Sequence, residues 1–140
     1  MSIPFGAVIP FVDHLGFTLE KFEGGHSELR YVPLADHLNS FDVTHGGAVM
    51  TLLDVVMATA ARSVEQDMGV VTIEMKTSFM RPAKVPAGQA LQANGQLLHR
   101  TRSMAFTEGK VFDNDGQLCA HATGTFKYVA RRASSSPATD

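Results

Sequence analysis

The sequence contains one cysteine, Cys119, so no disulfide can form within the chain, and we expect a buried, inert thiol there. No hydrophobic run approaches the length of a membrane span, and Pro4, Pro10 and Asp13 interrupt the apolar residues at the N-terminus. Neither a membrane segment nor a signal peptide is therefore expected. The formal net charge of −2 gives no electrostatic basis for binding nucleic acid or an acidic membrane surface. These absences leave a cytoplasmic protein as the expectation.

What is present is typical of one globular domain. The chain has 140 residues, of which 44% are apolar and 19% charged, enough for one hydrophobic core. We expect this domain to span residues 1–130. From residue 131 onward the composition changes to arginine, serine and proline, which predicts a disordered C-terminal tail over residues 131–140.

A helix is predicted from His45 to Ala61, and the rest of the chain is organised around it. Its apolar residues fall on every face, which predicts a helix buried on all sides rather than an amphipathic one. Asp54 is its only charged residue before Arg62. A carboxylate inside a core is costly unless it is paired or hydrogen-bonded. Asp54 is therefore a candidate catalytic residue, the alternative being a structural carboxylate bonded to a neighbouring loop.

The beginning of this helix is a second candidate for chemistry. Gly46 and Gly47 open it, where unpaired N–H groups and the positive end of the helix dipole attract negative charge. Glycine also lets a substrate approach the backbone closely, although two glycines are equally compatible with close helix packing. A polarising helix start and a buried carboxylate on one element favour an enzyme.

The segments on either side of the helix have the pattern of strands. Strands are predicted over residues 14–22 and 27–34 before the helix, and over residues 71–79, 89–101, 104–112 and 117–129 after it. A polar loop over residues 35–44 leads into the helix, and a turn with Gly69 is predicted to end it. In the strand that follows the helix, one face is predicted to carry alternate residues: Val71, Ile73, Met75, Thr77 and Phe79.

This order of elements predicts an α+β fold in which a curved antiparallel sheet wraps one long central helix. Such a sheet covers only part of a helix that is apolar on every face. We therefore expect a second copy to pair through a sheet edge, giving at least a dimer.

Five segments together resemble the hotdog-fold acyl-CoA thioesterases, most closely the phenylacetic-acid-degradation type. They are Asn39, His45-Gly46-Gly47, Asp54, residues 71–75 and residues 79–83, and the likeness runs over residues 14–129. The resemblance implies a hotdog fold, in which the sheet wraps the helix, and side-by-side dimers that often form tetramers. It also implies hydrolysis of the thioester bond of acyl-coenzyme A, without a metal or other cofactor.

The resemblance also implies a role for each matching residue. Gly46 would donate its N–H to the thioester carbonyl, with Asn39 helping to hold or polarise it. Asp54 would act as general base on water or as nucleophile, and Thr72 would position that water. His45 would support the loop or contact the substrate. Residue by residue, simpler roles stay open: a turn for Asn39, strand formation for Thr72, and a helix cap for His45.

One position departs from the family pattern, because relatives commonly have glycine where this chain has Asp42. Aspartate tolerates a left-handed turn, so we expect the loop to keep its shape with an added charge near the site.

Helix geometry constrains these roles. Gly46 and Asp54 are eight residues apart, roughly 12 Å along a helix that rises about 1.5 Å per residue. Both cannot contact one carbonyl group from the same chain, so if both act, each site must combine Gly46 of one subunit with Asp54 of another. A metal site is not expected, because His45 and Asp54 are farther apart still and the other histidines show no ligand spacing. Those histidines, His37 among them, are expected to be surface or strand residues.

Substrate contacts are less specified by the sequence. Arg81, Lys84, Arg100 and Arg102 are candidates for the coenzyme A phosphates, the alternative being ordinary surface charge. The candidate pocket residues, which are Met50, Met57, Met75 and Phe79, would admit aromatic and medium aliphatic acyl groups alike.

Two other functions remain as alternatives. One is a non-catalytic acyl-thioester-binding module on the same fold, in which Asp54 is structural. The weaker one is a hotdog dehydratase or hydratase, whose catalytic histidine and partner carboxylate belong to motifs that this sequence lacks.

Overall fold

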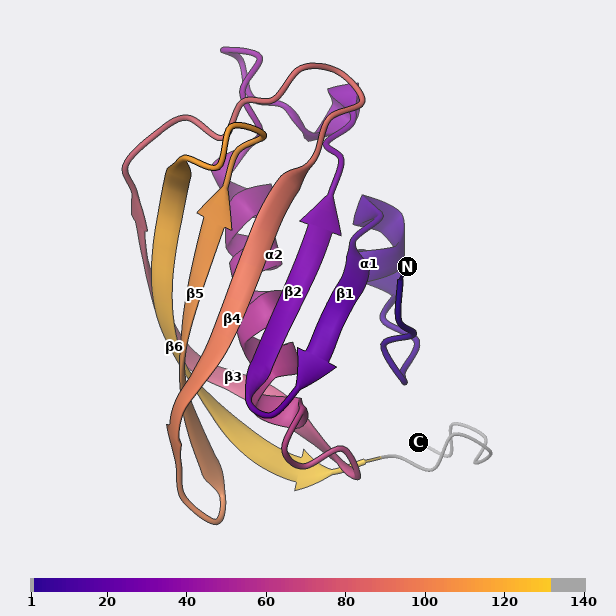
Figure 1. The fold of residues 1–140 in the computed structure, drawn as a ribbon, viewed down its shortest axis with the longest axis vertical. Helices are drawn as coiled ribbons and strands as arrows, with labels where there is room; N and C mark the ends of the chain where they lie inside the picture. Colours follow the sequence, from indigo (N-terminus) through magenta and orange to yellow (C-terminus); the bar gives the residue numbers. More distant parts are fainter. Residues whose placement is uncertain (1, 132–140) are drawn as a thin grey trace.

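A computed structural model describes residues 2–131, which form a six-stranded antiparallel sheet curved around one long helix (Figure 1). The strand order is β1-β2-β4-β5-β6-β3. The elements are α1 (Pro10–Leu15), β1 (Thr18–Glu23), β2 (His26–Tyr31), the 3-10 turn η1 (Ala35–His37), α2 (Gly46–Arg62), β3 (Met68–Phe79), β4 (Leu91–Arg100), β5 (Met104–Phe112) and β6 (Leu118–Ala130). The predicted tail lies outside the described residues, apart from Arg131. None of the helices within residues 2–131 combines the length and apolar character that crossing a membrane requires.

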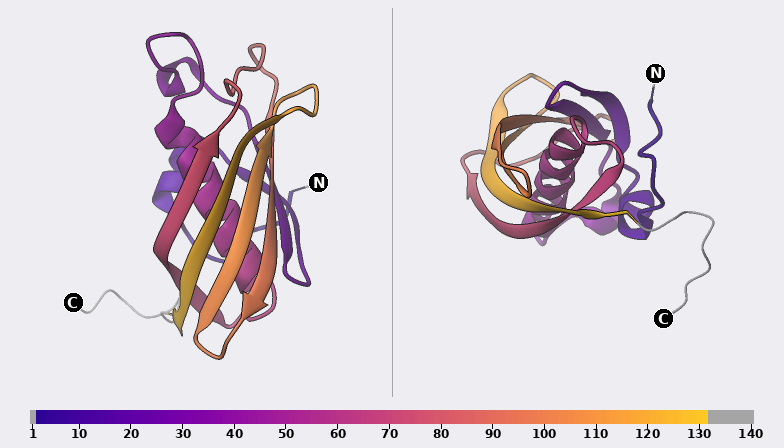
Figure 2. Two further views of the ribbon diagram at one scale, coloured as in Figure 1. Left: turned by 90° about the vertical axis from the view of Figure 1, so that its left-hand side faces the viewer. Right: turned by 90° about the horizontal axis from the view of Figure 1, so that it is seen from below.

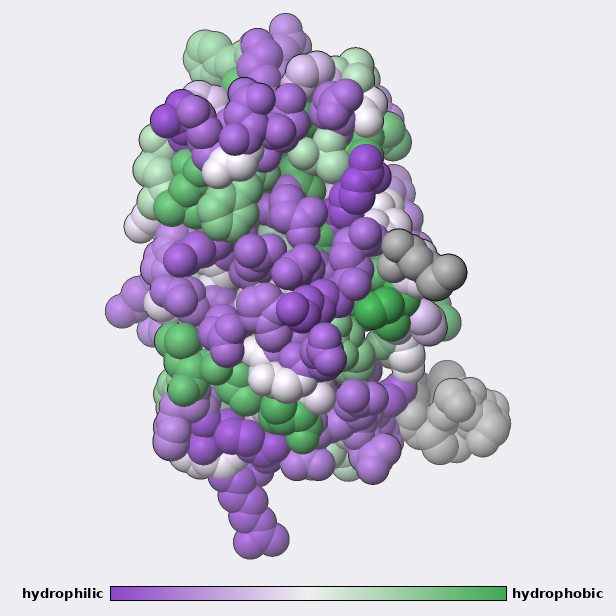
Figure 3. All heavy atoms as spheres, viewed as in Figure 1, coloured by the Kyte–Doolittle hydropathy of each residue, from purple (hydrophilic) through white to green (hydrophobic). Residues whose placement is uncertain are grey.

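The predicted α+β arrangement is confirmed. Seen from below, the sheet curls around α2, whose axis runs inside the curl (Figure 2). The inward residues of the strands form the core with the apolar side chains of α2, and this core includes Leu29, Leu53, Met57, Ala93 and Phe126. The opposite face of the sheet is largely hydrophilic (Figure 3). The sheet therefore has one buried face, and α2 fills it.

Small residues let α2 lie directly on the strands. A Cβ atom on Gly95 of β4 would lie 2.7 Å from the Ser27 hydroxyl oxygen and closer still to the carbonyl oxygen of Val56. The Ser27 hydroxyl, which is fully buried, donates a hydrogen bond of 2.5 Å to that same carbonyl. Gly95 pairs with Gly109 on β5, so the floor beneath α2 is flat across two strands. The backbone of α2 thus contacts the sheet at this point without a side chain between them.

Two boundaries differ from the prediction. Residues 14 and 15 belong to α1, not to a strand, because Pro10 starts a short helix and Gly16 ends it in a left-handed conformation with φ of 82°. Helix α2 ends at Arg62, and Gly69 lies inside β3 rather than in a terminating turn. The Ser63 hydroxyl donates to the Ala60 carbonyl and accepts the N–H of Gly25, so a tertiary contact ends the helix.

The face predicted for β3 holds for Met75, Thr77 and Phe79 but is wrong for Val71 and Ile73, because the strand contains a bulge. Thr72 pairs with Phe126 and Glu74 with Thr125, which leaves Ile73 as the extra residue. The bulge places Thr72 on the same side as Met75, which packs against the core. Val71 and Ile73 are 46% and 55% exposed, respectively. The simple alternation therefore holds only on either side of residue 73.

The two edges of the sheet are unequal. At the β1 edge the Ile3 N–H donates to the Leu19 carbonyl at 2.6 Å, so the N-terminal segment covers part of the strand. Arg62 and Arg131 hold this segment by donating to the carbonyls of Phe5 and Gly6. The β3 edge has no neighbouring strand within residues 2–131.

The contact at Gly95 generates a prediction about stability. Gly95→Ala should lower the free energy of unfolding by about 3 kcal/mol or more, because the new Cβ meets backbone atoms that cannot move independently. Gly109→Ala is the matched comparison, since its Cβ would meet flexible side-chain atoms of Met57 at 3.0 Å. It should be destabilising by only about 1 kcal/mol. Chemical denaturation measures both values, and equal losses would contradict the proposed backbone contact.

Candidate functional site

The first turn of α2 contains one N–H group that no acceptor within residues 2–131 binds. His45 caps the helix, because its Nδ1 accepts the N–H of Gly47 at 2.9 Å, and its carbonyl accepts the N–H of Ala48. Within the described residues, the N–H of Gly46 has no hydrogen-bond acceptor. The helix dipole adds partial positive charge at this position. The Gly46 N–H is therefore free to donate a hydrogen bond to an electronegative atom of a ligand.

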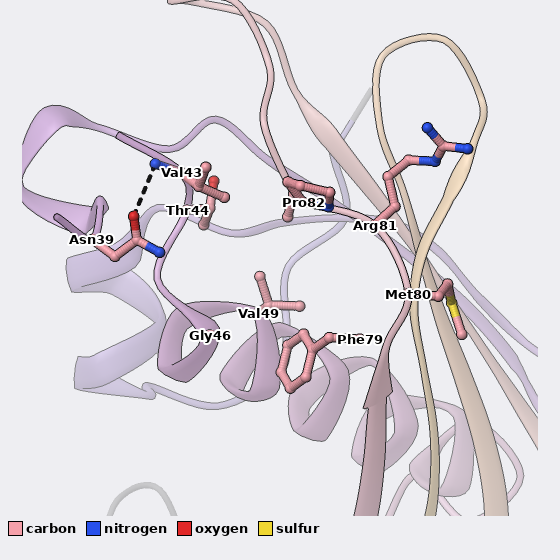
Figure 4. A pocket seen from close by; sticks show the side chains of 10 residues that line it. Asn39, Val43, Thr44, Gly46, Val49, Phe79, Met80, Arg81 and Pro82 are labelled. Atoms are coloured by element: carbon pink, nitrogen blue, oxygen red, sulfur yellow. Dashed lines mark hydrogen bonds between the residues drawn. The ribbon is translucent and has the colours of Figure 1, made fainter. Parts of the chain in front are cut away.

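A pocket of about 390 Å³ lies beside this turn (Figure 4). It is bounded by the loop before α2, the first turn of α2, and the segment that follows β3; the lining residues are Asn39, Val43, Thr44, Gly46, Val49, Phe79, Met80, Arg81, Pro82 and Ala83. The ring of Phe79 faces the first turn of α2, whereas the guanidinium of Arg81 points away from the pocket (Figure 4). The pocket thus combines an apolar wall with a free backbone donor.

Packing inside one protomer does not explain the glycine at position 46. A Cβ there would meet only the ring of Phe79, at 3.6 Å, which is an ordinary van der Waals contact. The alternative in which the glycines permit close helix packing is therefore not supported for Gly46. Because Gly46 has no side chain, a ligand in the pocket can approach its N–H directly.

Asn39 forms a turn and also faces the pocket. Its Oδ1 accepts the N–H groups of Phe41 at 2.8 Å and Val43 at 3.1 Å, so its orientation is fixed. The side-chain amide nitrogen points away from these two N–H groups (Figure 4), and among residues 2–131 no acceptor takes either of its hydrogens. Asp42, in the same loop, has φ of 59° and adopts the left-handed conformation that glycine would adopt easily. The expected loop shape is therefore present with aspartate at this position.

Asp54 and Thr72 form a hydrogen-bonded pair between α2 and β3. The Thr72 hydroxyl donates to Asp54 Oδ1 at 2.6 Å. Burial raises the pKa of Asp54 above its ordinary value of 3.8, and the hydrogen bond from Thr72 partly opposes this by lowering it. The bulge at Ile73 is what turns the Thr72 side chain toward the helix.

The position of Asp54 shows which flank of α2 the chain's own sheet leaves uncovered. Within a single chain Met50 is exposed, and Asp54, Val55 and Ala58 are only partly buried, as expected of a sheet that covers part of the helix. Asp54 lies on the flank that the sheet leaves uncovered, beside the open edge of β3. It does not line the 390 Å³ pocket, and along the helix it is roughly 12 Å from Gly46.

The four basic residues predicted for phosphate contacts are not gathered in one place. Arg81 borders the pocket, and Lys84 borders a neighbouring hollow of about 190 Å³. Arg100 lies near the other end of α2, where it pairs with Glu65 at 3.1 Å and stacks on the Tyr128 ring. Arg102 is in the hairpin between β4 and β5, at that same end of the molecule (Figure 1).

One histidine was placed wrongly from the sequence. His37 is 9% exposed and belongs to neither the surface nor a strand. Its Nδ1 lies 2.7 Å from the hydroxyl of the fully buried Tyr31. No sequence pattern marks this pair, because Tyr31 is in β2 and His37 is in the 3-10 turn η1. Among residues 2–131, no group of three or more histidine, cysteine, aspartate or glutamate side chains is arranged to hold a metal ion.

Comparison with known proteins shows that the chain belongs to the thioesterase superfamily. The thioesterase superfamily matches residues 41–120, which include the first turn of α2, Asp54 and Thr72. A Caenorhabditis elegans protein named as an esterase is 34% identical over 94 residues, covering 66% of this chain and 54% of its own length. Human acyl-coenzyme A thioesterase 13 is 29% identical over 72 residues, 51% of this chain and 50% of that protein. The chain thus spans about half the length of these two relatives.

Solved structures share the whole fold. The conserved protein PA5202 of Pseudomonas aeruginosa superposes with a TM-score of 0.81 at 28% identity, covering 89% of this chain and 97% of that one. A mutant of the phenylacetic acid degradation protein PaaI of Thermus thermophilus has a TM-score of 0.76 at 26% identity, covering 85% and 98%.

The Asp54–Thr72 pair leads to a prediction that needs no knowledge of the reaction. Thr72→Val keeps the β-branched shape but removes the donor that stabilises the carboxylate, so the pKa of Asp54 should rise further. Titration of the carboxyl carbon by ¹³C NMR measures it. Thr51→Val is the control, because the Thr51 hydroxyl on the same helix donates to Gly47 instead. A pKa that is unchanged in Thr72→Val would show that the hydrogen bond does not stabilise the carboxylate.

Proposed function

We propose that this chain, which belongs to the thioesterase superfamily and has the hotdog fold, hydrolyses the thioester bond of acyl-coenzyme A. The observation that carries the proposal is the Gly46 N–H, which faces the pocket and has no acceptor within residues 2–131. The same helix carries Asp54, which is hydrogen-bonded to Thr72 of β3. The name of the human relative, an acyl-coenzyme A thioesterase, supports coenzyme A as the thiol part of the substrate.

The pocket end of α2 suits the carbonyl of a thioester. When a nucleophile attacks, the carbonyl oxygen becomes an oxyanion, and a preoriented N–H stabilises the new charge. In this proposal the Gly46 N–H and the side-chain amide of Asn39 are the two donors. Asn39 is held by its turn, and Gly46 by the helix, so neither has to reorganise during the reaction.

Asp54 is the proposed general base or nucleophile. As a base it removes a proton from water, which attacks the carbonyl carbon; the C–S bond then breaks, and the coenzyme A thiolate leaves and takes up a proton. As a nucleophile its own oxygen attacks, the coenzyme A thiolate leaves, and water hydrolyses the resulting mixed anhydride. Partial burial, which raises its pKa, makes the carboxylate a stronger base than a solvated one. The Thr72 hydroxyl fixes the orientation of the carboxylate and, in our proposal, also helps to position the water.

The distance between the two halves requires a second copy. Gly46 and Asp54 are separated by roughly 12 Å along α2, so one thioester cannot contact both within a single protomer. We propose a dimer joined through the open β3 edge, with Gly46 and Asn39 of one protomer facing Asp54 and Thr72 of the other. The exposed Val71 and Ile73 on β3, and the uncovered flank of α2, support an interface there.

The dimer would also divide the phosphate contacts. Arg81 and Lys84 lie near the pocket of their own protomer, whereas Arg100 and Arg102 lie at its far end. Antiparallel pairing of two β3 edges places the far end of one protomer beside the pocket end of the other. We therefore assign Arg81 and Lys84 to the coenzyme A of their own pocket, and Arg100 and Arg102 to that of the second protomer.

A panel of acyl-coenzyme A substrates tests the function directly. Released thiol is measured with a thiol reagent, and aromatic and medium aliphatic acyl groups are ranked by kcat/KM. Turnover of at least one member is expected. Tight binding without turnover would instead identify a non-catalytic acyl-thioester-binding protein.

Asp54→Asn tests the role of the carboxylate. The nearly isosteric change should lower kcat by about 10²–10⁴-fold, the range associated with a general base, while fold and oligomeric state persist. Activity within a few-fold of wild type would exclude Asp54 as base or nucleophile.

The same variant makes a prediction about stability. Burial gives Asp54 a higher pKa in the folded chain than in the unfolded chain, so the folded state loses stability as the pH rises through these pKa values and the carboxylate ionises. The melting temperature of Asp54→Asn at neutral pH should therefore equal or exceed that of the wild type.

A mixed dimer tests the composite site. Asn39→Ala and Asp54→Ala chains should each be inactive, but a heterodimer of the two places both lesions in one site and leaves the other intact. With random pairing, about half of the dimers are mixed, so roughly a quarter of wild-type activity should return in the co-expressed mixture. The heterodimer, purified with two different affinity tags and assayed for thioester hydrolysis, should show about half of wild-type activity, because one of its two sites is intact. If it is inactive while folded and dimeric, each site is built within one chain.

A further inference from the structure

Tyr31 and His37 form a buried connection between the sheet and the loop that precedes α2. Tyr31 is the last residue of β2, is fully buried, and packs edge-on against Phe17 with ring centroids 4.8 Å apart. Its hydroxyl lies 2.7 Å from Nδ1 of His37. Burial raises the pKa of Tyr31 to about 12, so the phenol keeps its proton.

The direction of this hydrogen bond follows from a third group. The backbone N–H of Leu34 points at the same Nδ1 of His37, at 3.1 Å, and an amide N–H can only donate. Nδ1 must therefore be an acceptor, and the proton of the neutral ring is on Nε2. The Tyr31 hydroxyl is then a second donor to Nδ1. Two donors, one at the end of β2 and one in the segment after it, therefore hold the ring of His37 at Nδ1.

His37 in turn fixes the start of α2. Its backbone carbonyl accepts the N–H of His45 at 2.8 Å, and the next residues, Leu38 and Thr44, pair as an isolated bridge. These contacts close the base of the loop that contains Asn39. Because Gly46 follows His45 directly, a shift of His37 would move both proposed carbonyl donors together.

We propose that Tyr31 and His37 are positioning residues that hold Gly46 and Asn39 in register with the thioester carbonyl, an inference that rests on the proposed thioesterase function. Neither residue lines the 390 Å³ pocket, so they act through the backbone of the loop and not on the substrate. Since the oxyanion develops only during the reaction, misplaced donors lower kcat more than they change KM.

Tyr31→Phe should therefore lower kcat by about 10- to 100-fold, the range expected when a catalytic group is displaced by roughly 1 Å, with KM within about threefold of wild type. Tyr128→Phe is the matched control. Tyr128 is also buried, and its hydroxyl donates at 2.7 Å to the carbonyl of Ala61, at the opposite end of α2. Both variants should lose similar thermal stability, but only Tyr31→Phe should lose turnover. Equal kcat values in the two variants would reduce the Tyr31–His37 pair to a purely structural contact.

Two substitutions of His37 distinguish the effect of losing the acceptor atom from the effect of losing the ring. His37→Asn removes the ring but keeps an acceptor atom at the δ position, where Oδ1 can receive Leu34 N–H and Tyr31 O–H. His37→Leu has no acceptor. Turnover of His37→Asn should lie within about tenfold of wild type and well above that of His37→Leu. The proposal is overturned if the two variants turn over alike.

A measurement without turnover keeps the inference separate from the proposed function. In ¹⁵N NMR spectra, Tyr31→Phe should shift the backbone amide of Gly46 and the side-chain amide of Asn39, and Tyr128→Phe should shift neither. If no acyl-coenzyme A is hydrolysed by the wild type, the proposed function fails, and these shifts still decide whether the pair positions the loop. Unchanged resonances in Tyr31→Phe would exclude the positioning role whatever the activity.

Discussion

The structure depends most on the direct contact between the backbone of α2 and the sheet. The carbonyl of Val56 lies over Gly95 and accepts the buried hydroxyl of Ser27, so the helix has one height and one rotation relative to the strands. A rigid helix held at its middle has both ends fixed. The first turn of α2 is thereby placed beside the segment that follows β3, and the Asp54 flank beside β3 itself.

This fixed rotation gives the two flanks of α2 different tasks. The flank over the sheet is closely packed, with Leu53, Val56 and Met57 fully buried. The opposite flank carries the one carboxylate of the helix among residues that are only partly covered. A charged group on that flank does not disrupt the core of the protomer, and it still reaches a partly desolvated environment beside Thr72. Stability and the proposed chemistry therefore use separate surfaces of one element.

The periodicity of apolar residues predicted most of the fold. It failed where one extra residue shifts the alternation of inward and outward side chains, or where a tertiary contact decides the position of a residue. The central helix and the four strands after it were predictable because each alternates or repeats over many residues. The bulge at Ile73 was not, since nothing in the strand sequence marks the extra residue, and β-branched residues favour either face. The prediction that α2 is buried on all sides depends on a second copy and is not tested by a single chain, because apolar residues also occupy the flank that the chain's own sheet leaves open. His37 was misplaced because its partner Tyr31 lies on another element.

The candidate site was also predictable only in part. Asn39, Gly46, Asp54 and Thr72 could be proposed as site residues from motif spacing, and the structure adds the hydrogen bonds that orient Asn39, the first turn of α2, and Asp54. Sequence could not show that Arg81 and Arg100 lie at opposite ends of the molecule, because their separation depends on how β4 returns along the sheet.

The unequal edges of the sheet bear on how many copies can join. A strand edge with free N–H and C=O groups recruits another edge of the same kind, and a sheet with two such edges can extend without limit into a fibre. Here the N-terminal segment bonds to β1 at Ile3 and Leu19, whereas β3 is open. In the proposed dimer, pairing about a two-fold axis would use the β3 edges of both chains at once. The two β1 edges would then lie at the ends of the continuous sheet, where the N-terminal segment covers part of each strand at Leu19 and limits the addition of a further strand.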